Sequence, residues 1–485
     1  MKTKTTSLST LLAALLVLAG CSVAPTYQRP DVTTPTAFKE AAATQGNEGD
    51  WKPAQPAEEA PRGEWWKIFA DPQLDELETQ ALAANQDLKA AAARLGQARA
   101  LEQSARSALF PQVGVGFGPT RQRPSPASQG LAPEADTKAV TLWRAQANFS
   151  YEADLFGRVS SAADAARFDA ERNSALFRST LLALQADVAQ AYFLVRELDA
   201  SLALYEETVK LRSETLKLFQ HRYDAGDIGE LDLARAKTEY AAAQSESLGI
   251  TRQRAVAEHA LAILLGKAPA DFSLARLPLD RIKVSIPVGL PSALLERRPD
   301  IAAAERAMAA ANARIGTAKS AWFPRLSLTG ALGYESNELG DLFKSASRTA
   351  VFGPLVGTLL TLPVFDGGAR EAGVNRATAA YDEDVANYRQ SVLRAFKEVE
   401  DNLANLRILG DQNREQDSAV TSARRAAHLA QVQYREGAVA YFNVLDAERS
   451  ALQQQRVAVQ LDGERARSVV SLVRALGGGW DSTQQ

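Results

Sequence analysis

Residues 223–226 read Tyr-Asp-Ala-Gly, and residues 434–437 read Tyr-Arg-Glu-Gly, about 211 positions further along the chain. Two other pairs recur at nearly the same offset: Leu265-Gly266 as Leu476-Gly477, and Phe110-Pro111 as Phe323-Pro324. A period of this length is not that of a short solenoid repeat. It predicts two copies of one large unit, packed side by side about a pseudo-symmetry axis.

The segments that lead to these glycines are expected to be very long helices. From Leu181 to Val209, apolar residues recur at alternating spacings of three and four, which favours left-handed supercoiling of paired helices. A helix over 158–222 would be roughly 98 Å long, and one over 371–434 would be similar. Shorter helices then return over 230–265 and 441–476, so each copy ends in a helical hairpin.

Four other stretches alternate apolar and polar residues with a period of two, which is typical of membrane-barrel strands. They are 112–118 and 143–154 in the first copy, and 326–335 and 354–364 in the second. Segments 119–140 and 336–352 are polar, as expected for loops. Four strands cannot close a barrel around a pore, and open edges are not viable in lipid. Other copies of the chain must therefore complete the barrel. A trimer would give twelve strands, while pattern alone leaves a dimer or a tetramer open.

The N-terminus has the pattern of a secretory signal, with two lysines before an apolar stretch too short to span a bilayer. It ends at Cys21, the only cysteine of the chain, where cleavage should occur. This position predicts lipidation of the thiol, with an ordinary signal peptide as the alternative. Ser22, rather than an acidic residue, indicates retention in the outer membrane of a Gram-negative cell.

These patterns give a mainly α chain with a transmembrane β part. Residues 1–20 are the signal peptide, and 21–64 are a lipidated, proline-rich segment expected to run extended over a surface. The first structural repeat, 65–270, holds a helix, two strands and the long hairpin. A linker, 271–299, leads to the second repeat, 300–485, with the same contents.

Composition argues against nucleic acid and against catalysis. The formal net charge is −3, and it becomes −5 when the signal's two lysines are removed. None of the three histidines has another metal-ligating residue at the spacing that a metal site needs. The only cysteine is expected to be acylated, so no thiol is left to act as a nucleophile. We therefore expect no enzyme activity, no cofactor and no metal site. The histidines are His221, His259 and His428.

Several short strings, in this order along the mature chain, resemble the TolC-like outer-membrane efflux channels, and among them the lipidated OprM-like branch. They are Trp65-Trp66, Asp71-Pro72, Asp154-Leu155-Phe156-Gly157-Arg158, Glu296-Arg297-Arg298-Pro299-Asp300-Ile301, Trp322-Phe323-Pro324, Phe365-Asp366-Gly367-Gly368, Val444-Leu445-Asp446-Ala447 and Ala475-Leu476-Gly477-Gly478-Gly479-Trp480. The resemblance implies a homotrimeric tube, in which a twelve-stranded barrel continues into a long coiled-coil α-barrel. Such a tube would be the exit duct of a tripartite pump for drugs or other small toxic compounds. A periplasmic adaptor would join it to an inner-membrane transporter of the resistance-nodulation-division type.

The resemblance also implies a gate at the periplasmic helix tips. Carried over by position, Asn443 and Asp446 face the lumen, where three Asp446 carboxylates repel one another. Arg449 lies on the same face and would neutralise part of that ring. Tyr434 and Asp232 match a phenol-to-carboxylate hydrogen bond between the two hairpins. The alternative for Asp446 is a solvated surface carboxylate.

The tips depart from the best-known family pattern. Val439 stands where an arginine is found, and Asn443 stands where an aspartate is often found. We therefore expect a gate that is weaker in charge and held more by Tyr434 and apolar packing. The turns are expected to dock hairpins of the adaptor, or to serve only as turns. Their residues are Gly226, Asp227, Ile228, Gly229, Gly437, Ala438, Val439 and Ala440.

Two other readings remain open. A structural coiled-coil lipoprotein of the outer membrane fits the heptads and the lipid, but not the four strands or the duplication. Within the channel class, a metal-efflux or protein-secretion duct is the alternative. The scarcity of methionine counts against soft metals, since Met308 is the only one besides the start.

Overall fold

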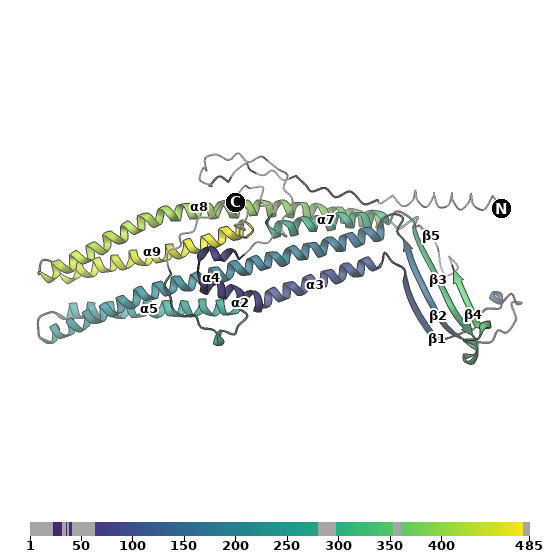
Figure 1. Cartoon of the computed structure of the whole chain (residues 1–485), viewed down its shortest axis with the longest axis horizontal. Helices are drawn as coiled ribbons and strands as arrows, with labels where there is room; N and C mark the ends of the chain where they lie inside the picture. Colours follow the sequence, from purple (N-terminus) through teal and green to yellow (C-terminus); the bar gives the residue numbers. More distant parts are fainter. Residues whose placement is uncertain are drawn as a thin grey trace. The chain divides into compact units, whose positions relative to one another are not determined.

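The computed structural model describes residues 23–31, 35, 38–40, 64–279, 297–352 and 360–478 (Figure 1). The predicted signal peptide and Cys21 lie outside the described residues. The chain divides into two compact units. The first comprises Met1–Asp31, Arg94–Ser174 and Ala303–Tyr388, and the second comprises Val32–Ala93, Ala175–Ala302 and Arg389–Gln485.

The two copies have helices of identical length. Helices α4 (Arg158–Asp224) and α8 (Ala369–Arg435) have 67 residues each, and α5 (Glu230–Leu264) and α9 (Tyr441–Ala475) have 35 each. Every corresponding end is offset by 211 residues, so the predicted duplication is confirmed. Helices α4 and α8 each contribute residues to both units.

The first repeat begins with two helices rather than the one that the sequence predicts. They are α2 (Pro72–Ala84) and α3 (Gln86–Ser107), after a short 3-10 helix η1 (Trp65–Phe69). The helical conformation is interrupted at Asn85, whose ψ is 131°. Its side chain accepts from the Leu88 N–H at 2.8 Å and donates to the Leu264 carbonyl at 2.9 Å. This side chain satisfies backbone groups at two helix ends, which periodicity does not reveal.

The second copy holds its own hairpin end in a related way. Here α7 (Pro299–Ser320) is the counterpart of α3. Arg298, just before α7, donates to the Ala475 carbonyl at 3.0 Å, and this carbonyl is the counterpart of that of Leu264. Arg298 also donates to Asp300 at 2.7 Å and to Glu398 at 2.7 Å. An arginine thus does in the second copy what an asparagine does in the first.

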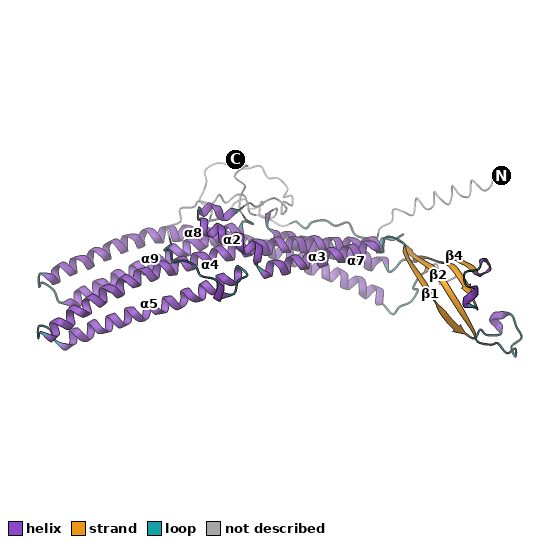
Figure 2. Ribbon diagram, turned by 60° about the horizontal axis from the view of Figure 1, so that its bottom comes forward, coloured by secondary structure: helices purple, strands orange, loops and turns teal. Residues whose placement is uncertain are grey.

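The sheet belongs to the first unit and is antiparallel throughout (Figure 2). Its strands are β1 (Gln112–Gln122), β2 (Val140–Ala153), β3 (Arg325–Ser336), β4 (Arg348–Phe352) and β5 (Leu360–Thr361). The order is β1-β2-β3-β4, and β5 also pairs with β3. The expected strand over 354–364 is represented by β5, since 353–359 lie outside the described residues. The expected loop over 336–352 is too long, because 348–352 pair with β3 as β4.

The strand register gives the sheet two different faces. One face is apolar, because Trp143, Ala145, Ala147 and Phe149 of β2 lie opposite Ser336, Tyr334, Leu332 and Gly330 of β3. The other is polar and includes an ion pair in which Arg144 Nε lies 2.7 Å from Glu335 Oε2. This alternation is that of a strand with lipid on one side and water on the other. Among the described helices, none is long and apolar enough to cross a membrane.

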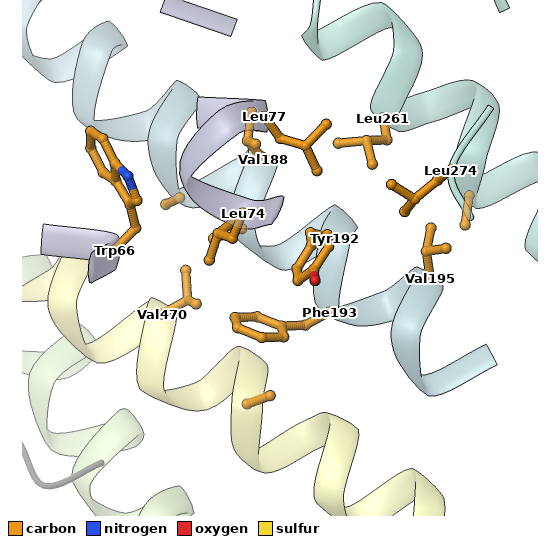
Figure 3. Close-up of a cluster of buried hydrophobic side chains, with 14 of the residues drawn as sticks. Trp66, Leu74, Leu77, Val188, Tyr192, Phe193, Val195, Leu261, Leu274 and Val470 are labelled. Carbon is orange, nitrogen blue, oxygen red and sulfur yellow. The ribbon is translucent and has the colours of Figure 1, made fainter. Parts of the chain in front are cut away.

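The main core of the second unit forms where α2 packs against α4, α5 and α9. Leu74 of α2, Tyr192 of α4, Leu261 of α5 and Val470 of α9 are all buried there (Figure 3). The Tyr192 hydroxyl donates to the Asp71 carboxylate at 2.5 Å. Helix α2 therefore holds the two hairpins together at the end opposite to their turns.

Candidate functional site at the helix turns

The two hairpin turns have the same backbone geometry. Gly226 has a φ of +82° and Gly437 a φ of +75°, in the left-handed region that favours glycine. In the first turn, the Asp227 N–H donates to the Arg222 carbonyl at 2.8 Å, and the Gly226 N–H donates to that of Tyr223 at 2.9 Å. The second turn repeats both bonds 211 residues later. Each long helix thus ends in a Schellman motif that turns the chain sharply.

The helices that return from these turns begin without a side-chain cap. The N-cap residues are Gly229 for α5 and Ala440 for α9, and neither makes a side-chain hydrogen bond to the first turn. A helix start leaves several N–H groups without an intrahelical acceptor. The tips therefore present donors, framed by small residues, to water or to a partner.

Behind the turns, an apolar cluster joins the two hairpins. Phe219 of α4 and Leu233 of α5 are buried, and Tyr434 and Tyr441 pack against them. The ring centroids of Phe219 and Tyr441 lie 4.4 Å apart, and those of Tyr434 and Tyr441 lie 5.6 Å apart. Tyr434 of the second hairpin thus packs against a cluster whose buried members belong to the first.

Tyr434 has a different polar partner from the one expected. Arg222 Nη1 donates to the Tyr434 hydroxyl at 3.1 Å. Asp232 instead lies 3.7 Å from Arg235, three residues along α5. The predicted bond between Tyr434 and Asp232 is therefore wrong in this structure. The reason is that Arg235 lies one turn from the carboxylate on its own helix, while Arg222 from α4 reaches the phenol.

Arg449 also differs from the expectation. It donates to Glu239 of α5, and this bond is the main cause that raises the pKa of Arg449. Asp446 contributes a smaller electrostatic effect of the same sign. Arg449 therefore links the two hairpins in addition to lying near Asp446. Asn443 and Asp446 are exposed on α9, whereas Val444 between them is buried.

Sequence reasoning missed the centre of this region, Arg212 of α4. Arg212 is buried and donates to Glu448 of α9, and its Nε lies 3.9 Å from Glu239 Oε2. Gln431 of α8 donates to the other Glu448 oxygen at 2.7 Å. We call Arg212, Glu239, Gln431, Glu448 and Arg449 the inter-hairpin polar network, because it connects α4, α5, α8 and α9.

A signal for Arg212 exists in the sequence. The alternating spacing of Leu202, Tyr205 and Val209 continues through position 212 to Leu216 and Phe219. An arginine on such a seam faces the partner helix rather than water, so it needs a buried partner. Within the described residues, no group of three or more His, Cys, Asp or Glu could hold a metal ion.

A two-faced sheet joined to two long helical hairpins defines the class of TolC-like outer-membrane channels. The chain belongs to the outer membrane efflux protein family, whose model matches residues 77–267 and 290–478. The resemblance stated from the sequence is thereby confirmed. The protein is an outer-membrane efflux protein of the Gram-negative type, with a large periplasmic part.

Individual relatives are similar along almost their whole length. The chain is 36% identical over 475 residues to the toluene efflux pump outer membrane protein TtgF of Pseudomonas putida, covering 97% of this chain and 96% of that protein. The structure of the outer-membrane channel OprN has a TM-score of 0.84 at 30% identity, covering 95% of this chain and 100% of that chain. The open state of the Neisseria gonorrhoeae MtrE channel has a TM-score of 0.80 at 30% identity, with 95% and 98% covered.

Proposed function

We propose that three copies of this chain form the exit duct of a tripartite efflux pump, gated at the hairpin turns. A periplasmic adaptor joins the duct to an inner-membrane transporter of the resistance-nodulation-division type. Acylation of Cys21 anchors each copy to the outer membrane. The cargo is a set of small toxic compounds, and the name of the relative TtgF supports apolar aromatic solvents among them.

The observation that carries this proposal is the two-faced sheet with its two edges. Within the described strands of one chain, β1 forms one edge, and β4 and β5 lie along the other side of β3. An edge strand in lipid leaves backbone N–H and C=O groups without partners, at several kcal/mol each. Neighbouring copies supply those partners, and three copies of four strand positions give a barrel of about twelve strands.

The gate belongs to the tips because two sets of contacts between the hairpins lie near the turns, away from the core around α2. The inter-hairpin polar network and the cluster around Phe219 both lie between the hairpins, and both must change if the hairpins part. Asn443 and Asp446 are exposed on α9, as a ring around a threefold axis requires. The small, uncapped turns would receive the adaptor's hairpins.

Single-channel recording in a planar bilayer tests this function. Wild-type protein, purified from outer membranes, is compared with Asp446→Ala and with the control Glu415→Ala, an exposed carboxylate elsewhere on α8. We expect a low, cation-preferring wild-type conductance that Asp446→Ala alone changes. If a pore forms but neither substitution alters it, the gate is not at Asp446. A lipidated oligomer that forms no pore would favour a structural coiled-coil lipoprotein.

A further inference from the structure

The apolar face of the sheet carries charge at one end only. Residues that pair directly across antiparallel strands lie on the same face, so this face consists of odd positions in β1 and β2 and even positions in β3 and β4. Among those positions of the described strands, the charged residues are Arg121 of β1 and Arg348 of β4. Both are positive, and none of the described strands places a carboxylate on this face.

Both arginines lie at the end of the sheet that is away from the helices. Arg121 is one residue before the end of β1, and Arg348 is the first residue of β4. Strand β1 follows α3 and β3 follows α7, so the helices meet the sheet at its other end (Figure 2). The long helices belong to the periplasmic part. The two arginines therefore lie at the outer leaflet of the outer membrane.

Aromatic rings surround the arginines on the same face. The ring centroids of Phe117 and Trp143 lie 6.0 Å apart, and those of Tyr334 and Phe343 lie 5.4 Å apart. Arg348 pairs directly with Tyr334 across β3 and β4. Aromatic side chains are enriched where the apolar interior of a membrane meets water. The rings thus mark the depth at which lipid head groups begin, and the arginines lie at that depth.

Arginines on the two faces of this end differ in their partners. On the polar face, Arg144 forms the ion pair with Glu335 described above. Arg121 and Arg348 are exposed, and neither makes an ion pair or a side-chain hydrogen bond within the part of the chain that the structure describes. Their guanidinium groups are therefore available to an anion from outside the chain. At the head-group depth of a membrane, that anion is a lipid phosphate.

We propose that Arg121 and Arg348 bind the phosphate groups of an anionic lipid in the outer leaflet. A guanidinium donates two parallel hydrogen bonds to a phosphate, which combines charge with a fixed geometry. The rings of Phe117, Trp143 and Tyr334 pack beside the lipid where its acyl chains begin. Recognition thus depends on the phosphate and on its depth in the membrane.

In the proposed assembly, the two arginines belong to one site. Strand β1 forms one edge of the sheet, and β4 lies on the other side of β3. Strand β1 of one copy therefore lies beside β4 of the next copy. Arg121 and Arg348 are at the same end of their strands, so one of each frames a phosphate position at every boundary between copies. This step rests on the proposed trimer and gives three equivalent positions in a closed particle.

Native mass spectrometry of the intact particle in detergent tests the site. The probe is lipid A with both of its phosphates, and the comparison is the same lipid after both phosphates have been removed. We expect wild type to bind up to three phosphorylated lipids per trimer, and the dephosphorylated lipid more weakly by about tenfold or more. Arg121→Gln and Arg348→Gln should each lower the affinity for the phosphorylated lipid about tenfold and leave that for the dephosphorylated lipid unchanged.

The matched control is Lys138→Gln. It removes a positive charge from an exposed residue at the same end of the sheet, two residues before β2 begins. This variant should bind the phosphorylated lipid as wild type does. An equal loss in the control would overturn the site, because general surface charge would then explain the binding. Equal wild-type affinity for the two lipids would also overturn it, as would displacement of the lipid by inorganic phosphate at the same concentration.

The same spectra give the number of copies in the particle, so failure of the two proposals can be distinguished. A trimer whose lipid binding is unchanged by Arg121→Gln and Arg348→Gln refutes the lipid site and leaves the exit duct standing. A particle that is not a trimer refutes the proposed assembly. Weaker lipid binding by both variants of such a particle would still assign the phosphate to these arginines.

Discussion

Replacing Arg212 with methionine should favour separation of the two hairpins. The Arg212 side chain is 3% exposed, and the carboxylates that it serves, Glu448 and Glu239, are 12% and 11% exposed. Methionine keeps the apolar stem but removes the cation, which leaves Arg449 as the remaining positive group of the network. Removing one partner of a buried ion pair costs about 3–5 kcal/mol. We expect the lower end, because water can reach the carboxylates.

This cost falls on the arrangement in which the hairpins are packed together. At about 1.36 kcal/mol per factor of ten, a loss of about 3 kcal/mol shifts the equilibrium toward parted hairpins by more than 100-fold. Single-channel recording should therefore show a large rise in open probability for Arg212→Met. The matched control is Arg235→Met, near the same tip. Arg235 is 42% exposed and lies 3.7 Å from its partner, so its ion pair contributes no more than about 1 kcal/mol.

The measurement requires variants that still assemble, which their mass in detergent establishes. An assembled Arg212→Met channel with the open probability of wild type would refute the reasoning. So would an equal rise in the Arg235→Met control, because burial would then make no difference. A rise confined to Arg212→Met assigns the effect to the inter-hairpin polar network.

Three further substitutions have definite expected outcomes. Burial raises the pKa of Glu78 to about 9, and its two carboxylate oxygens have no hydrogen-bond partner within the described residues. Its folded-state pKa lies above the unfolded value, so the free energy of unfolding should fall as pH rises from about 4.5 to about 9. The fall should amount to about 3 kcal/mol at pH 7, and Glu78→Gln should remove it. Heat-denaturation midpoints of wild type and variant, each measured at pH 5 and pH 8, check this. Gly316→Ala should displace the N-terminal segment, since the added Cβ would lie 2.6 Å from the Cβ of Ala24. Limited proteolysis should cleave that segment faster in this variant than in the control Gly373→Ala, where an added Cβ meets nothing within 4 Å. Gly226→Ala should loosen the first turn by about 1–2 kcal/mol, because φ is +82°, and hydrogen exchange there should exceed that of Gly229→Ala, where φ is −79°.

Much of the fold could be predicted because its signals are local. The glycines at 226 and 437 and the long stretches without proline mark the helix ends, which lie within two residues of those expected. Alternation marks three of the strands for the same reason. The break at Asn85 and the start of β4 at Arg348 were not predicted, because each depends on a partner distant in sequence: the Leu264 carbonyl and strand β3.

The candidate site likewise has one part that the sequence predicts and one part that it does not. The turns follow from sequence alone, because only glycine adopts a positive φ at little cost. The partners of Tyr434, Arg449 and Arg212 do not. Each of these three residues contacts a partner on another helix, and an arginine takes part in every contact. A long charged side chain can reach several groups within one turn of its own position, so the sequence does not say which group it meets.

The sequence by itself determined that this protein is a duplicated chain of long hairpins and membrane strands, and that it belongs with the outer-membrane efflux channels. Those properties follow from periodicity, turn chemistry and ordered motifs, which act over a few residues at a time. Only the tertiary structure decided that a buried arginine, rather than Asp232, ties the hairpins together near the tips. The physical reason is that a polar network is fixed by which helices meet and at what rotation, and one helix's sequence does not contain that information.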